Sequence, residues 1–149
     1  QVDMEKFYEV LVVDDDPIHN TVFKKLAEWN SFSEKVVSFI SAVDCLDYLK
    51  ACQEEELPPP TMIFLDIKMP IVNGWEFLER LEKMNDHHYF SQIAIYMLTS
   101  SSEQSDINKA KKYNMVTDYF VKPITMEILN EIRSRHQQEK ETKGKPLYS

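Results

Sequence analysis

Five polar residues, each placed where a short apolar run ends, have the side chains needed for phosphoryl transfer. They are Asp14, Asp15, Asp66, Thr99 and Lys122. Carboxylates that are packed together repel one another and raise one another's pKa unless a cation joins them. Magnesium is a hard cation that takes oxygen ligands, and a lysine and a hydroxyl suit a phosphoryl oxygen. We therefore expect a Mg2+-dependent transfer of a phosphoryl group onto Asp66, with that carboxylate as the nucleophile.

These side chains can meet only if the apolar runs before them are parallel strands of one sheet. The pattern predicts strands at residues 7–13, 36–40, 62–65, 93–98 and 119–121, with a segment of helical periodicity after each strand. This alternation favours an α/β fold with a doubly wound, five-stranded parallel sheet and five helices. The carboxyl ends of parallel strands lie at one edge, where ligands bind in such sheets.

Turn and cap residues set the expected limits of the helices. Asp16 is a predicted N-cap before Pro17, and Ser41 is a predicted N-cap of the second helix. Asn73-Gly74 is a turn signal in which Gly74 is free to take a left-handed conformation. A helical apolar face is predicted from spacings of four, four and three at Ile18, Val22, Leu26 and Trp29.

Composition limits the possible classes of protein. The 149 residues suit one domain at 7–137, between an extension at 1–6 and a charged tail at 138–149 that we expect to be frayed. With 25 acidic and 17 basic residues, the net charge of -8 argues against a broad nucleic-acid or anionic membrane surface. No run approaches the roughly 20 apolar residues of a membrane span.

The cysteines and histidines carry little of the predicted chemistry. Cys45 and Cys52 lie too far apart on one helix for a disulfide, so a reducing, cytoplasmic setting is expected. The N-terminus lacks a signal-peptide pattern. The histidines share no ligand spacing with cysteines or carboxylates, and we predict no metal role for them. They are His19, His87, His88 and His136.

Four motifs together resemble the receiver domain of two-component response regulators. They are Val12 to Pro17 (VVDDDP), Phe64 to Pro70 (FLDIKMP) with Asn73-Gly74, Leu98 to Ser100, and Phe120 to Pro123 (FVKP). The resemblance covers residues 7–137 and is closest to single-domain receivers of the chemotaxis-regulator kind. It implies a flavodoxin-like fold with strand order 2-1-3-4-5.

The resemblance also implies roles for the acidic residues. Asp66 would be the phosphoacceptor. Asp15 and Asp66 would ligate Mg2+ through their carboxylates, Lys68 through its backbone carbonyl, and Asp14 through water. These roles would make the chain a phosphoacceptor signalling domain, limited to its own phosphorylation and dephosphorylation.

The same resemblance implies a switch. Thr99 would be the hydroxyl that follows the phosphoryl group, Lys122 would pair with that group, and Tyr119 would be the aromatic that turns inward when Thr99 moves. The signal would leave through the surface of the fourth helix, fifth strand and fifth helix. Lys68 and Ser101, each two residues beyond a site residue, would lie near the pocket mouth and tune the lifetime of the phosphorylated state.

The expected partners are a histidine kinase or phosphotransfer protein and a downstream protein or output domain, with a possible phosphorylation-dependent dimer. Two other functions remain open: a degenerate receiver that binds partners constitutively, and a Mg2+-dependent phosphatase of the aspartyl-phosphate kind. Such phosphatases carry a second aspartate two residues after the nucleophile as general acid. Lys68 occupies that position here, and a lysine cannot serve as that acid near neutral pH.

Overall fold

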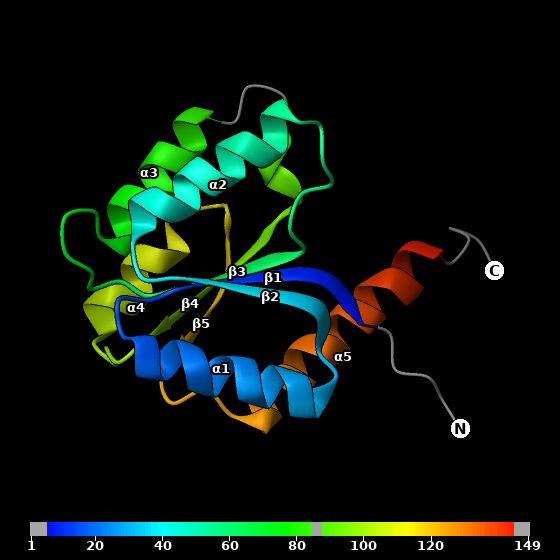
Figure 1. Ribbon diagram of the computed structural model, residues 1–149. Helices are drawn as coiled ribbons and strands as arrows, with labels where there is room; N and C mark the ends of the chain where they lie inside the picture. Colours follow the sequence, from blue (N-terminus) through cyan, green and yellow to red (C-terminus); the bar gives the residue numbers. More distant parts are fainter. Residues whose placement is uncertain (1–5, 85–87, 145–149) are drawn as a thin grey trace.

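Five parallel strands form one sheet in the order β2-β1-β3-β4-β5 (Figure 1). A computed structural model describes residues 6–84 and 88–144. The strands are β1 (Phe7–Val13), β2 (Ser33–Phe39), β3 (Met62–Leu65), β4 (Ala94–Thr99) and β5 (Val116–Val121). The predicted fold class, strand number and strand order are therefore confirmed. β2 begins three positions earlier than predicted, and Ile40 lies beyond its end and is exposed.

The helices cover both faces of the sheet. They are α1 (Pro17–Asn30), α2 (Ala42–Glu54), α3 (Gly74–Met84), α4 (Gln104–Lys111) and α5 (Met126–Gly144), with a short 3-10 helix, η1 (Phe90–Gln92), before β4. One apolar core packs the sheet against α2, α3 and Ala110 of α4. A second core packs the other face against α1 and α5 (Figure 1). Two cores on two faces are what a doubly wound sheet requires.

The predicted apolar face of α1 is wrong at three of its four residues, whereas Leu26 is partly buried and packs against the second core. Ile18 and Trp29 are 73% and 72% exposed, and Val22 is exposed as well. The residues that α1 buries are Asn20, Phe23, Ala27 and Asn30. The predicted N-cap is confirmed, because the Asp16 carboxylate accepts a hydrogen bond from the Ile18 N–H at 2.9 Å. Ser41 likewise caps α2 by accepting the Asp44 N–H.

The last helix is longer than predicted. α5 continues to Gly144, so the backbone from residue 138 to 144 is helical and not a frayed tail. Residues 1–5 of the predicted extension and 145–149 of the predicted tail lie outside the described residues, as does His87. None of the described helices is both long and apolar enough to cross a membrane.

Candidate functional site

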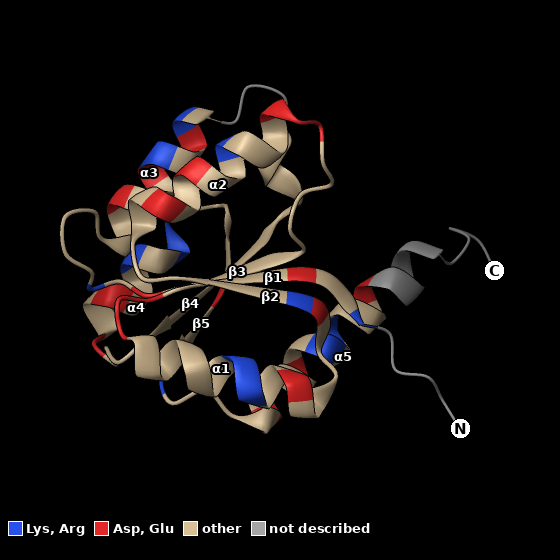
Figure 2. Ribbon diagram, viewed as in Figure 1, with Lys and Arg blue, Asp and Glu red and all other residues tan. Residues whose placement is uncertain are grey.

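The ends of β1 and β3 bring three carboxylates together at the carboxyl edge of the sheet. Asp14 and Asp66 follow the adjacent strands, and the Asp66 N–H donates to the Val13 carbonyl at 3.0 Å. One carboxylate oxygen from each of Asp14, Asp15 and Asp66 lies within 4.8 Å of the others. Figure 2 shows the acidic segment where β1 leads into α1. The predicted acidic cluster is therefore present in the structure.

The burial of the three acids differs in a way that suits a hydrated cation. Asp14 and Asp66 are 1% and 6% exposed, whereas Asp15 is exposed. The cluster thus has two fixed, desolvated carboxylates and a third, that of Asp15, which is accessible to solvent. Mg2+ binds through a few carboxylate oxygens and keeps several waters, so the donor set fits this ion.

Lys122 lies between the two buried carboxylates. Its Nζ is 2.5 Å from Asp14 Oδ2 and 3.2 Å from Asp66 Oδ2. Its backbone N–H donates to the Thr99 carbonyl at 2.8 Å, which ties the end of β5 to the end of β4. Burial alone would lower the pKa of Lys122, but the two carboxylates raise it above its usual range. The site therefore holds a fixed positive charge beside Asp66, as predicted.

His19 belongs to this site, although the sequence analysis gave it no role there. Its Nδ1 lies 3.0 Å from Asp14 Oδ2, and its side chain is 11% exposed. The next residue, Asn20, donates from Nδ2 to the Asp14 backbone carbonyl at 2.9 Å. Burial would raise the pKa of Asp14, but the contacts with His19 and Lys122 and the Asp16 N–H lower it. Because α1 begins at Pro17, its first turn lies beside the end of β1. The start of α1 at Pro17 was the sequence feature that could have placed His19 near Asp14.

Gly74 holds the acceptor loop through close packing. Its N–H donates to the Ile67 carbonyl at 2.8 Å, and the Ile67 N–H donates to Asp66 Oδ1 at 2.8 Å. A Cβ on Gly74 would lie 2.4 Å from the Asp66 carbonyl oxygen. The prediction of a left-handed conformation at Gly74 is wrong, because no described glycine has a positive φ. The left-handed residue of this loop is Ile71, with a φ of 69°.

The predicted switch residues are Thr99, at the end of β4, and Tyr119 on β5, and both contact the backbone of Ser101 just beyond β4. Thr99 is fully buried, and the Ser101 N–H is 3.5 Å from Thr99 Oγ1. The Tyr119 hydroxyl donates to the Ser101 carbonyl at 2.8 Å, and burial raises the pKa of that hydroxyl. The Ser101 hydroxyl donates to Asp106 on α4 at 2.6 Å. Its side chain thus faces α4, and its effect on phosphorylated lifetime stays a prediction.

Lys68 lies in the loop between β3 and α3, where it is exposed. Its backbone carbonyl as a cation ligand and its side chain as a tuner of lifetime stay predictions. The loop continues into α3 through a reciprocal cap, in which Asn73 Oδ1 accepts the Glu76 N–H at 2.9 Å and Glu76 Oε1 accepts the Asn73 N–H at 3.3 Å. This capping box stabilises the first turn of α3.

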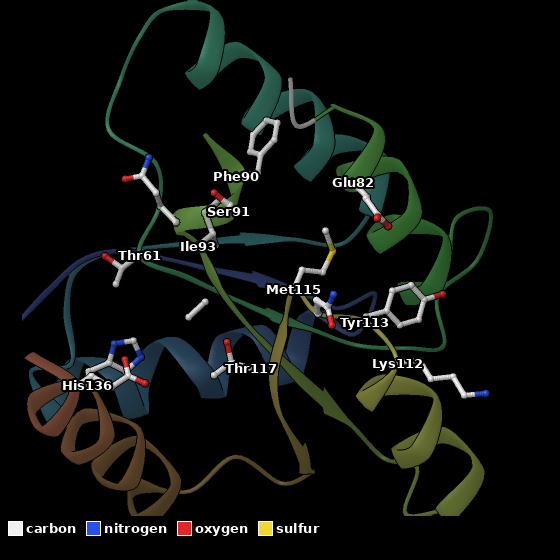
Figure 3. Close-up of a pocket in the computed structure, with 14 residues that line it drawn as sticks. Thr61, Glu82, Phe90, Ser91, Ile93, Lys112, Tyr113, Met115, Thr117 and His136 are labelled. Atoms are coloured by element: carbon white, nitrogen blue, oxygen red, sulfur yellow. The ribbon is translucent and has the colours of Figure 1, made fainter. Parts of the chain in front are cut away.

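A separate cleft lies at the amino end of the sheet. It has a volume of about 750 Å3 and is lined by residues such as Thr61, Ile93, Thr117 and His136 (Figure 3). The His136 Nε2 and the Tyr96 hydroxyl are 2.8 Å apart beside it. None of the predicted site residues lines this cleft. The acidic cluster lies outside this cleft, at the carboxyl edge of the sheet.

Comparison with known proteins agrees with this geometry. A family model of the response regulator receiver domain matches residues 10–133. A two-component response regulator from Cytophaga hutchinsonii is similar in structure, with a TM-score of 0.80 and 28% identity over 90% of this chain and 99% of that one. The bacteriophytochrome response regulator RtBRR has a TM-score of 0.69 and 29% identity, over 87% of this chain and 76% of that one.

Curated relatives are similar over different shares of their length. The probable methanogenesis regulatory protein FilR2 of Methanothrix harundinacea is 26% identical over 86% of this chain and 80% of its own. The transcriptional regulatory protein CitT of Halalkalibacterium halodurans is 25% identical over 95% of this chain but only 57% of its own. The chain thus spans little more than half of the second protein.

Proposed function

Because the chain belongs to the response regulator receiver domain family, we propose that it accepts a phosphoryl group on Asp66 in a Mg2+-dependent reaction. One observation carries the proposal. Asp66 shares its end of the sheet with Asp14, Asp15 and Lys122, at distances suited to a cation and a phosphoryl group. The group would come from a histidine kinase or phosphotransfer protein.

Each residue has a defined part in this chemistry. An Asp66 carboxylate oxygen forms the new P–O bond, the P–N bond to the donor histidine breaks, and the imidazole keeps that electron pair. Lys122, already 3.2 Å from Asp66 Oδ2, offsets the negative charge of the transferring group. Asp14, Asp15, Asp66 and the Lys68 carbonyl would hold Mg2+, which when bound neutralises phosphoryl charge.

The apolar stripe of α1 supports docking of a protein donor. We define this stripe as Ile18, Val22 and Trp29, which are 73%, 46% and 72% exposed. It starts two residues after Asp16, at the mouth of the acidic site. Exposed apolar side chains that share a helix face mark an interaction surface. A phosphorylated histidine phosphotransfer protein that packs on this stripe would present its histidine to Asp66.

Trp29→Ala should separate docking from chemistry. Removal of the exposed ring should slow transfer from a phosphorylated histidine phosphotransfer protein by about tenfold, since an aromatic anchor of an interface is worth more than about 1.4 kcal/mol. Labelling by a small acyl phosphate should keep its wild-type rate. Equal slowing with both donors would mean that Trp29 acts on the fold and not on docking.

The proposal includes the change by which the phosphorylated protein is recognised by a downstream partner. Phosphorylation would move Thr99 and Tyr119 and thereby change the surface of α4, β5 and α5, which a downstream protein, an output domain or a second copy would recognise. On the edge strand β5, Phe120 is half-buried and Val121 is exposed. The buried free thiols of Cys45 and Cys52 support a reducing, cytoplasmic setting.

Phosphate incorporation from an acyl phosphate, with and without Mg2+, tests the proposal. Wild type and the control Asp47→Asn, an exposed carboxylate of α2, should be labelled when Mg2+ is present, and Asp66→Asn should not. Labelling of Asp66→Asn at the wild-type level would place the acceptor elsewhere. An unlabelled wild type would favour the degenerate receiver that binds constitutively. Steady hydrolysis of phosphomonoesters would favour the phosphatase.

A further inference from the structure

His19 is a buried imidazole to which the proposed phosphoryl transfer gives no part. Its Nδ1 lies 3.0 Å from Asp14 Oδ2, the same oxygen that Lys122 Nζ approaches to 2.5 Å. Among the described residues, neither ring nitrogen of His19 makes a directed hydrogen bond, and Asp14 Oδ2 accepts none. Buried polar atoms without such a bond are rare and need a specific reason. His19 is therefore held close to this carboxylate without being bonded to it.

The other polar atoms of Asp14 are already fixed. Asp14 Oδ1 accepts the Asp16 N–H at 2.9 Å, and the Asp14 backbone carbonyl accepts from Asn20 Nδ2 at 2.9 Å. Asp14 is only 1% exposed, so bulk water does not reach Oδ2 to replace a lost partner. In the resting protein Oδ2 thus depends on its ion pair with Lys122, and His19 lies beside it as a second donor.

The proposed function gives Lys122 a second partner that competes with Asp14. Lys122 would pair with the phosphoryl group on Asp66, whose Oδ2 is 3.2 Å from Nζ in the resting protein. Movement toward that group draws Nζ away from Asp14 Oδ2. A buried carboxylate that loses its partner is strongly destabilised. Asp14 therefore needs another donor while Lys122 is engaged with the phosphoryl group.

We propose that His19 is a positioning residue that binds Asp14 Oδ2 when Lys122 turns to the phosphoryl group. The inference rests on the proposed function and adds one residue to it. Rotation of the imidazole would convert the 3.0 Å contact into a hydrogen bond in which the Nδ1–H donates to the carboxylate. Asp14 then keeps its place in the acidic cluster throughout the transfer.

A double-mutant cycle in the resting protein tests this exchange of partners without metal or phosphoryl group. His19→Leu removes the donor and keeps an apolar side chain of similar size. With Lys122 present, it should leave the unfolding equilibrium constant nearly unchanged. In the Lys122→Met background it should raise that constant about tenfold, as expected for loss of a hydrogen bond to a charged group. An equal or smaller effect without Lys122 would overturn the proposal.

Two matched variants separate hydrogen bonding from packing. Asparagine carries its Nδ2 donor near the position of the imidazole Nδ1, so His19→Asn should keep the wild-type unfolding equilibrium in the Lys122→Met background. If His19→Asn destabilises as much as His19→Leu there, the ring acts by packing, and the role of Nδ1 is refuted. Lys25→Ala removes an exposed cation of α1 and should behave alike in both backgrounds.

Binding of a phosphoryl analogue provides the readout in the activated state. Calorimetry should give wild type and His19→Leu the same affinity for Mg2+ alone, because Lys122 still pairs with Asp14. Mg2+ with beryllofluoride should bind about tenfold more weakly to His19→Leu. Equal weakening with both probes would mean that His19 supports the resting site, and would refute the exchange. No analogue binding in wild type would refute phosphoacceptance, and the double-mutant cycle would still decide the role of His19.

Discussion

Gly74→Ala should disrupt the acceptor loop through a single methyl group. The added Cβ would lie 2.4 Å from the Asp66 carbonyl oxygen and 2.9 Å from the Ile67 Cα. Both are backbone atoms, so no side chain can rotate away to make room. Ordinary contact begins near 3.4 Å, and the loop must therefore move by about 1.0 Å (3.4 minus 2.4) relative to α3. The residues that move include the predicted phosphoacceptor.

The expected change in the free energy of unfolding of Gly74→Ala is the sum of two opposing contributions. Overpacking of this kind costs about 1–3 kcal/mol. Alanine is favoured over glycine in a helix by up to about 1 kcal/mol, and the gain is smaller at the first helical position. We expect a net loss of about 1–2 kcal/mol in the free energy of unfolding. With a typical dependence on urea, the unfolding midpoint should fall by roughly 0.5–1 M.

The chemical effect should exceed the loss of stability. A displacement of about 1 Å in a reacting group can slow a reaction by about 100-fold. The rate of Asp66 labelling by an acyl phosphate, measured well below the unfolding midpoint, should show this loss in Gly74→Ala. Asn73→Ala is the control, because it removes the capping oxygen of α3 without a clash. It should cost about 1 kcal/mol of stability and leave the labelling rate nearly unchanged.

A Gly74→Ala protein with the wild-type urea midpoint would refute the packing argument. Wild-type labelling together with reduced stability would show that the close approach stabilises the loop but does not position the acceptor.

Two further changes test residues outside the acidic cluster. Lys68→Ala should change the decay rate of phosphorylated protein, and an unchanged rate would exclude the exposed Lys68 side chain from the pocket mouth. Burial lowers the pKa of His136 below 6.5, against the opposing charge of Glu139. As pH falls below about 6.5 the unfolded chain takes up a proton that the folded chain does not, so stability should fall. His136→Gln should flatten that fall in urea titrations between about pH 7.5 and 5.5, and an unaltered slope would assign it to other groups.

The meeting of the site residues could be predicted from the sequence because the strands of a parallel sheet all have their carboxyl ends at one edge. Once the runs before Asp14, Asp66, Thr99 and Lys122 were identified as parallel strands, their ends had to meet at one edge. The position of His19 needed an additional fact, namely that α1 turns back over β1 directly after Pro17. The direction of the Ser101 hydroxyl was beyond sequence reasoning, because a loop of a few residues can aim a short side chain either way.

The error in α1 has a different cause and is more informative. Periodicity identifies the helix face that carries apolar residues, and this face is the buried one only when burial is what selects them. In α1 the inner face holds two polar residues. Asn20 donates to the Asp14 carbonyl, and Asn30 donates to Asn130 Oδ1 at 2.7 Å on α5. These hydrogen bonds fix α1 to the site and to α5, so the inner face can be polar. The apolar side chains of the α1 stripe therefore contribute little to the core, and their exposure supports the proposed docking of a partner on α1.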